Sequence, residues 1–331
     1  WPIMTILIYS IPFAGIMQLL LVWTAAKRAG LIIRPSRPRL SKDMRTLVRV
    51  AIPSALANGV LQINLLVGQF VSSQETGAIS WLYGADRLYQ LPLGVVGIAV
   101  GIVLLPELSK RLQAGDRAGA QIAFSRANEI SFGLSFPSSV ALFVIPMPLV
   151  SAIFEHGATN NRDIEAISLA CAIYGLGLPA FMLQKILQPL YFSQENTILP
   201  FRFALIAMII NGVLAIGLME PFGWIAPAIA VTISAWAMVG LLAFGARKFE
   251  DIARIGKASQ YRMIRIGFSA IGMGLVLWGV DTFIGTYTET TLARVSYAII
   301  LLLIGFSVYV MLANLSGAFK LSDLRKVLKR S

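Results

Sequence analysis

Long apolar runs, separated by short polar connections, constrain this chain more than any other feature of its sequence. A helix needs about 20 mostly apolar residues to cross roughly 30 Å of hydrocarbon. Of all residues, 57% are hydrophobic and only 13% are charged, which is far less charge than a soluble domain of this length carries. The sequence therefore predicts an all-α polytopic membrane protein with about nine transmembrane helices. The predicted spans are 1–26, 46–72, 80–106, 126–154, 164–192, 198–219, 223–245, 263–285 and 292–314.

The charged residues are concentrated in alternate connections between these spans. The net charge is +12, and basic residues follow the first, third, seventh and last spans, whereas the intervening connections hold one basic residue, Arg162. The positive-inside rule then places the first residue outside and the C-terminus in the cytoplasm, with the short turn after 164–192 placed inside by counting. The mixed-charge segment 107–126 is expected to lie along the inner surface. A basic groove with interleaved aromatic residues is absent, so no nucleic-acid partner is predicted.

The inventory of reactive residues argues against an enzyme. Cys171 is the single cysteine and lies in an apolar run, and His156 is the single histidine. The sequence has no GxxxxGK[ST] loop, no HExxH motif and no CxxC motif, so we expect no cofactor and no metal site. The chain opens with WPIMTILIYS, without the basic n-region of a signal peptide, and we expect it to begin partway through a longer protein.

The stretch YGADRLYQLP places Asp86 and Arg87 six or seven residues into the third span, roughly 10 Å along the helix. A charge at the centre of a span costs about 2.5–3.5 kcal/mol, and less nearer its edge. One explanation is a local ion pair, or an arginine that reaches the outer headgroups. The other is a cation that faces a water-filled cavity, with Asp86 orienting it. Ser80, Tyr83 and Gln90 share the helical face of Arg87, which favours the cavity.

A second candidate cation is Lys185, about seven residues from the end of its span. Its alkyl chain could extend so that the ammonium group reaches the inner interface. Alternatively, Pro179 and Pro189, with nearby glycine and glutamine residues, predict a broken helix with a polar lining, which is tolerated where it borders a cavity.

A smaller polar patch lies in the second span, where Gln62 is flanked by Asn58 and Asn64. These amides could line the same cavity, or they could form hydrogen bonds between helices. Small residues that favour close helix packing in the third span are Gly94, Gly97 and Gly101.

Three segments resemble the MurJ/MviN lipid II flippases, within the multidrug/oligosaccharidyl-lipid/polysaccharide exporter superfamily. They are ADRLYQLPLGVVGIAVGIVLLPELSK, IPSALANGVLQINLLVGQFVSS with the following GAISWLYGADR, and ALFVIPMPLVSAIFEHGATN. The resemblance implies a two-lobe exporter fold of fourteen spans, of which this chain would hold the last nine. Residues 1–45 would form the last helix of the first lobe with a basic interlobe loop, 46–245 the second six-helix lobe, and 246–331 two additional helices with a basic tail.

The resemblance also implies a function. A member of this family moves undecaprenyl-pyrophosphate-linked peptidoglycan precursor (lipid II) from the inner to the outer leaflet of the bacterial cytoplasmic membrane, by alternating access. Arg87 matches a cavity arginine, Asp86 its acidic neighbour, Ser80 a cavity serine and Lys185 a basic residue, while Gln90 stands where some relatives have a glutamate. The implied partners are lipid II, membrane lipids and the upstream first lobe of the same protein.

Two alternatives to a lipid II flippase are open at this point. One is a flippase for another polyprenyl-linked oligosaccharide, which charge alone does not separate from a lipid II flippase. The other is a non-transporting membrane scaffold for cell-wall synthesis, which would not need Arg87. A drug exporter is disfavoured, because its cavity should be acidic and the spans expected to form the cavity offer only Asp86.

Overall fold

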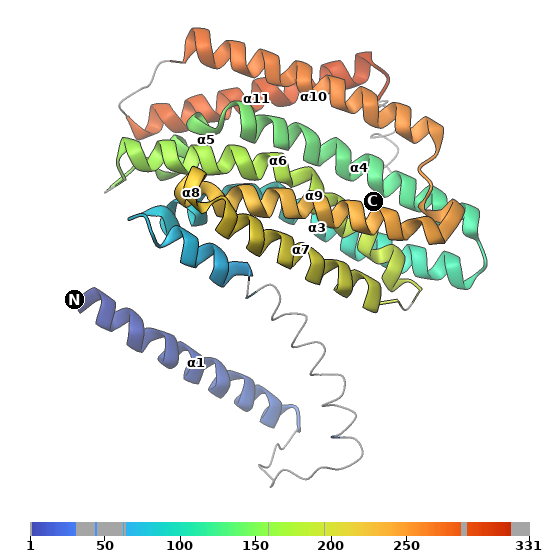
Figure 1. Cartoon of the computed structure of the whole chain (residues 1–331), viewed down its shortest axis with the longest axis horizontal. Helices are drawn as coiled ribbons and strands as arrows, with labels where there is room; N and C mark the ends of the chain where they lie inside the picture. Colours follow the sequence, from blue (N-terminus) through green and yellow to red (C-terminus); the bar gives the residue numbers. More distant parts are fainter. Residues whose placement is uncertain are drawn as a thin grey trace. The chain divides into compact units, whose positions relative to one another are not determined.

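The computed structural model describes residues 2–30, 44, 62, 64–157, 159–194, 196–285 and 290–318, and within these residues the regular structure is helical (Figure 1). The chain divides into two units, Trp1–Ala55 and Leu56–Ser331. The first unit contains α1 (Pro2–Arg28), whose apolar side chains are exposed and whose last turn carries Lys27 and Arg28. The class of fold expected from the sequence, a helical membrane protein, is confirmed.

The second unit is a bundle in which α6 is the central helix. Within this unit α6 contacts α3, α4, α5 and α9, while α10 packs on α4 and α11 packs on α10 and α5 (Figure 1). The helices are α3 (Ala78–Gln113), α4 (Arg117–Val144), α5 (Pro146–Phe154), α6 (Asn161–Phe192), α7 (Ile198–Gly217), α8 (Met219–Phe222), α9 (Ala226–Ala246), α10 (Lys257–Ile284) and α11 (Thr291–Leu315), with 3-10 turns η1 (Gly223–Ile225) and η2 (Arg247–Ala253) on either side of α9. Residues 64–72, ahead of α3, are also helical.

Among the described residues, six helices are long and apolar enough to cross a membrane, and the pair α4 and α5 adds a seventh. These seven cover seven of the predicted spans. The span 80–106 corresponds to α3, a single 36-residue helix that is not among the six. The span 46–72 lies largely outside the described residues. The predicted span 126–154 is bent by 82° between α4 and α5, where Pro146 begins a new helix because its fixed φ suits a first turn.

The segment 107–126, which was expected to lie along the inner surface, is divided between two helices. Its first part is the end of α3 and its last part is the start of α4. Between them, Gly115 adopts a φ of 73°, and the carboxylate of Asp116 accepts a hydrogen bond from the Gly119 N–H at 2.8 Å. Arg111 binds both Glu107, at 2.6 Å, and Asp116, at 3.1 Å. The mixed charges therefore close a tight turn between two long helices.

The predicted break in α6 is also absent, because α6 continues from Asn161 to Phe192 through Pro179 and Pro189. A proline has no N–H, so it leaves the carbonyl four residues earlier without its usual donor. For Pro179 that carbonyl belongs to Gly175, and the hydroxyl of Ser139 in α4 donates to it at 2.6 Å. A neighbouring helix thus supplies the missing hydrogen bond, and the helix continues.

The same arrangement occurs at Pro137 in α4. The carbonyl without a backbone donor is that of Gly133, and the hydroxyl of Tyr309 in α11 donates to it at 2.7 Å. Tyr309 is buried, so this bond forms between two helices away from solvent. Both prolines are therefore accommodated by hydroxyl groups that also join one helix to the next.

Helices α3, α6 and α9 run parallel. Trp81 of α3 donates a hydrogen bond to Asp163 of α6 at 2.7 Å, and further along both helices Lys185 lies against Gly97. Side chains of α6 and α9 bind each other's carbonyls in four places, and the first and last of these pairs show that the two helices advance together: Thr232 to Ile173, Trp236 to Leu176, Gln184 to Ala235 and Tyr191 to Leu242. The intervening segments α4–α5 and α7 must therefore return in the opposite direction.

The connections gather at two opposite ends of this bundle, in agreement with the alternation predicted from charge. Where α3, α6 and α9 begin, Arg162 binds Glu75 at 2.6 Å, and Arg294 binds Glu155 at 2.8 Å. The opposite end, where these helices terminate, will be called the basic end, because it carries the basic connections 107–117 and 246–262. There Gln121 of α4 donates to the Arg254 carbonyl at 3.0 Å.

Removing the hydroxyl groups that serve Pro137 and Pro179 should destabilise the bundle. Hydrogen bonds between membrane helices contribute about 0.6 kcal/mol on average and up to about 1.7 kcal/mol. We expect Tyr309→Phe and Ser139→Ala each to lower the free energy of unfolding by an amount in this range, measured by denaturant titration in micelles.

A double-mutant cycle separates this effect from a loss of packing. Pro137→Ala restores a backbone N–H at position 137, which can donate to Gly133, so Tyr309→Phe should cost less in that background. An equal cost in both backgrounds would show that the hydroxyl of Tyr309 does not compensate for the proline.

Candidate functional site

One face of α3 carries polar side chains that are exposed over more than two turns. Ser80, Tyr83, Arg87 and Gln90 are all exposed, and they follow the spacing of three and four residues that places side chains on one helical face. The opposite face packs into the core through Trp81, Ala85 and Leu88, which are buried. The helix therefore separates an apolar packing face from a polar face that is available to a ligand.

Asp86 and Arg87 do not form the ion pair that their adjacency suggested. Neighbouring residues on a helix point in directions about 100° apart, so their side chains do not face each other. The carboxylate of Asp86 instead accepts a hydrogen bond from the amide nitrogen of Gln90, one turn further along. Within the described part of the chain, no hydrogen bond or ion pair engages the guanidinium of Arg87.

The start of this face is tied to the preceding helix. The amide nitrogen of Gln69 donates to the hydroxyl of Tyr83 at 3.1 Å. This contact fixes the Tyr83 ring beside the polar face, one turn before Arg87. Gln69 was not predicted from the sequence, because a single glutamine in an apolar run carries no signal of its partner.

An aromatic layer lies between α3 and α6. The ring of Tyr89 lies 5.2 Å from that of Tyr174 and 5.5 Å from that of Phe181, in tilted arrangements. Such pairs add stability beyond their buried area. These contacts orient α3 so that Arg87 stays on the exposed face. The sequence alone did not predict them, because Tyr89 is far along the chain from Tyr174 and Phe181.

Lys185 is exposed, and its side chain lies across Gly97 of α3. A Cβ atom at Gly97 would be 2.9 Å from the Lys185 Cδ atom, so an alanine at this position would require the flexible lysine side chain to shift. The predicted glycine strip therefore receives a lysine side chain at this position. Ten residues separate Arg87 from Gly97, which is about 15 Å along the helix, so the two cations lie at different depths along the same helix pair.

The polar patch in the second span is only partly described. Gln62 is helical and exposed, and no described contact joins it to the residues on the polar face of α3. Asn64 accepts a hydrogen bond from Asn211 of α7 at 3.0 Å, so this residue serves the contact between helices. Asn58 lies outside the described residues.

The chemistry available on the polar face of α3 is that of anion binding. Arg87 offers a planar guanidinium with several N–H donors, flanked by hydroxyl and amide groups. No group of three or more His, Cys, Asp or Glu side chains is positioned to hold a metal ion within the ranges that the structure describes. The site therefore offers a positive charge and several hydrogen-bond donors to an anion.

Comparison with known proteins gives a consistent result. A family model described as "Lipid II flippase MurJ" matches residues 2–316. The "Probable lipid II flippase MurJ" of Rhizobium tropici is 35% identical over 327 residues, which cover 97% of this chain and 61% of that protein. The corresponding protein of Rhizobium meliloti (strain 1021) is 41% identical over 229 residues, covering 69% and 43%.

A solved structure is also similar in fold. The structure titled "Lipid II flippase MurJ, inward closed conformation" superposes with a TM-score of 0.71 at 25% sequence identity, over 87% of this chain and 57% of that one. In both comparisons the chain spans only part of the other protein, about 61% of the length of the Rhizobium tropici relative and 57% of the solved chain.

The contact between Gly97 and Lys185 can be tested with a matched pair of substitutions. Replacing glycine by alanine within a helix gains up to about 1 kcal/mol of helix propensity. A Cβ at Gly94 would meet no atom within 4 Å, so Gly94→Ala should be stabilising. Gly97→Ala should gain less or lose stability, because the Lys185 side chain must move. Both are measured as the free energy of unfolding in micelles.

Lys185→Ala provides the control for this comparison. Without the lysine stem, Gly97→Ala should become as favourable as Gly94→Ala. A difference between the two glycines that persists in the Lys185→Ala background would rule out the lysine contact as its cause.

Proposed function

Because the family model matches residues 2–316, the chain belongs to the MurJ lipid II flippase family, and we propose that it takes part in moving lipid II from the inner to the outer leaflet of the bacterial cytoplasmic membrane. Beyond family membership, the observation that carries this proposal is Arg87. It is an exposed guanidinium, without an ion pair among the described residues, on the polar face of a long helix in a membrane protein.

A pyrophosphate is the group that such a site suits. Arginine binds phosphate oxygens through paired, charge-assisted hydrogen bonds, which are about twice as strong as neutral ones. In the proposed site, Arg87 binds the pyrophosphate, and the hydroxyl groups of Ser80 and Tyr83 contribute further donors. The hydrogen bond from Gln90 to Asp86 holds that carboxylate near Arg87, while the guanidinium of Arg87 stays free to bind the phosphate oxygens.

Lys185 is proposed as a second cation for the same substrate. Because it lies about 15 Å along the helix pair from Arg87, it would meet the pyrophosphate at a different stage of passage across the membrane. Gln62, on the preceding helix, is proposed as an additional polar wall of the same cavity. The polyprenyl chain would stay in lipid while the head group passes through water, and the lobes would open to each side in turn.

The domain arrangement and orientation belong to the same proposal. Residues 46–245 form the second lobe, 1–45 the last helix of the first lobe with its basic loop, and 246–331 the two additional helices with a basic tail. The basic end and the C-terminus face the cytoplasm. The facing wall of the cavity comes from the upstream first lobe of the same protein. The protein acts as a transporter, with no bond-breaking step and no cofactor.

Arg87→Ala in the full-length protein should strongly reduce the translocation of lipid II in reconstituted vesicles. Loss of a charge-assisted hydrogen bond of about 1.5–3 kcal/mol corresponds to a rate reduced roughly tenfold to a hundredfold. Arg87→Lys should give a translocation rate between those of the unsubstituted protein and Arg87→Ala, because lysine keeps the positive charge but lacks the planar guanidinium that makes paired hydrogen bonds. The unfolding free energy should be almost unchanged, since no described residue depends on Arg87.

Arg202→Ala is the matched control, because Arg202 is an exposed arginine of α7 far along the sequence from the polar face. It should retain normal translocation. Full translocation by Arg87→Ala would contradict the proposed site, whereas absence of translocation by the unsubstituted protein would favour a scaffold role. Equal movement of an unrelated polyprenyl-pyrophosphate oligosaccharide would show that the site does not select lipid II.

A further inference from the structure

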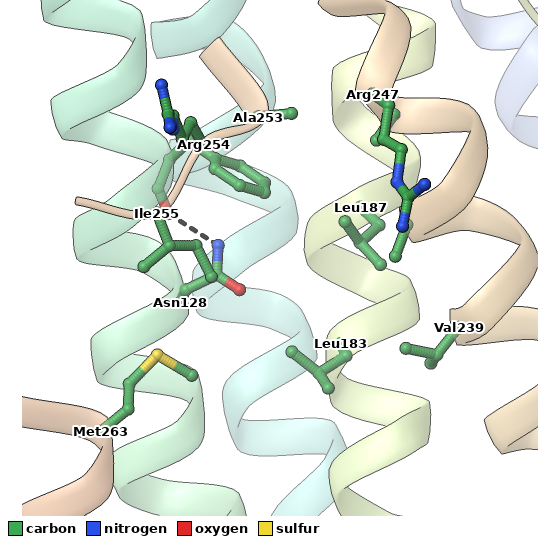
Figure 2. A pocket seen from close by; sticks show the side chains of 12 residues that line it. Asn128, Leu183, Leu187, Val239, Arg247, Ala253, Arg254, Ile255 and Met263 are labelled. Carbon is green, nitrogen blue, oxygen red and sulfur yellow. Dashed lines mark hydrogen bonds between the residues drawn. The ribbon is translucent and has the colours of Figure 1, made fainter. Parts of the chain in front are cut away.

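A second site lies at the basic end of the bundle, away from the polar face of α3. A cavity of about 630 Å³ opens there among α4, α6, α9, η2, residues 254–255 and α10, and none of the described side chains of α3 lines it (Figure 2). Its volume is typical of pockets that hold one small molecule. The two candidate cations of the transport site, Arg87 and Lys185, are not part of its wall.

Two arginines, Arg247 and Arg254, belong to the cavity wall. Figure 2 shows them on opposite sides of the cavity, Arg247 beside α9 and Arg254 beside α4. Both are exposed, and among the described residues neither guanidinium takes part in a hydrogen bond or an ion pair. The one described contact is that of Arg247 with the ring of Phe244, at 5.1 Å. Two cations without a described carboxylate partner make this an anion-binding position.

The backbone that carries these arginines is fixed to the bundle. Gln121 donates to the carbonyl of Arg254 at 3.0 Å, and Gln260 donates to that of Ile255 at 3.1 Å. The ring of Phe249 packs edge-on against Tyr191 at 5.0 Å, and Ile252 is buried. The arginines are therefore placed before a ligand arrives, which lowers the entropy lost on binding.

The rest of the cavity is mostly apolar. Leu183 and Leu187 of α6, Val239 of α9 and Met263 of α10 point toward it in Figure 2. Asn128 is the buried polar exception. Its amide nitrogen donates to the Phe124 carbonyl at 2.9 Å, which leaves its oxygen as an acceptor in the wall. A free inorganic anion would leave this apolar surface unfilled, whereas a molecule with an acyl chain would cover it.

We propose that this cavity binds an anionic glycerophospholipid of the adjacent leaflet. The phosphodiester lies between Arg247 and Arg254, and the first carbons of an acyl chain cover Leu183 and Leu187. The charge complementarity favours an anionic over a zwitterionic headgroup, because a second, positive headgroup charge would meet no described carboxylate. The location agrees as well, since the inner leaflet is negatively charged and the basic end is proposed to face it.

The test measures the thermal unfolding midpoint of the purified full-length protein in neutral detergent as lipid is added. Phosphatidylglycerol should raise the midpoint in a saturable manner, because it binds the folded state. Arg247→Gln and Arg254→Gln should each weaken the apparent affinity about tenfold, as expected for loss of one charge-assisted hydrogen bond. Lys248→Gln is the matched control, since Lys248 is exposed next to Arg247 and does not line the cavity.

A second variant addresses the apolar part without changing the charge. Ala243 lines the cavity and is exposed, so Ala243→Phe should fold normally and occupy the space of the acyl chain. It should abolish the effect of phosphatidylglycerol. An unaltered response in this variant, or in both arginine variants, would overturn the proposal.

The ligands used for comparison decide the chemical class. Phosphatidylcholine and glycerol phosphate should each have little effect at matched concentration. An equal effect of phosphatidylcholine would overturn the role of charge, and an equal effect of glycerol phosphate would reduce the site to a binder of soluble anions. An equal effect of undecaprenyl phosphate would assign the site to polyprenyl phosphates instead of glycerophospholipids. Because none of these assays measures transport, their failure leaves the proposed lipid II site untouched.

Discussion

The arrangement of the bundle depends on one requirement, that every backbone carbonyl and N–H group in hydrocarbon find a partner within the protein. Pro137 in α4 and Pro179 in α6 violate this requirement locally, and hydroxyl groups from neighbouring helices supply the missing donors. Ser139 serves the carbonyl that Pro179 leaves free, and Tyr309 serves the one left by Pro137. The central position of α6 follows in part from this, because a side chain of α4 supplies the hydrogen bond that Pro179 removes, and side chains of α9 make further hydrogen bonds to α6 carbonyls.

The proposed transport site depends in turn on how α3 meets α6. The aromatic contacts of Tyr89 and the bond between Trp81 and Asp163 turn one face of α3 toward α6. The opposite face is thereby left for polar groups, and the pairing of Asp86 with Gln90 keeps its cation available. A charge inside a membrane is costly when it is unsolvated, so a guanidinium that forms no hydrogen bond or ion pair with the described residues belongs beside water or an anionic ligand. In the proposed site, the Asp86 carboxylate therefore accepts a hydrogen bond from Gln90, and Arg87 keeps its guanidinium N–H groups for a ligand.

Hydropathy and charge were sufficient to predict a helical membrane protein, seven of its spans and the alternation of its connections, because these properties depend on local composition. The polar face of α3 was also predictable, since helical spacing places Ser80, Tyr83, Arg87 and Gln90 together. What the sequence did not reveal depends on partners distant in the chain. Pro179 signalled a break because Ser139, which prevents it, lies in another helix. Asp86 and Arg87 suggested an ion pair because Gln90 offered no sign of its competing bond. The cavity at the basic end is assembled from five helical elements and the connection after η2, none of which has a distinctive motif of its own.

The two hydroxyl bonds have a joint effect on movement. Tyr309 of α11 binds α4 at Gly133, and α4 binds α6 through Ser139, only six residues away. Hydrogen bonds thus join α11 to α4 and α4 to α6, with α4 as the shared helix. A hydrogen bond tolerates only a few tenths of an ångström of stretch before it weakens. Any sliding of α11 past α4 must therefore release a buried carbonyl or carry α4 along, so movement of α11 is coupled through α4 to α6, the helix that bears Lys185.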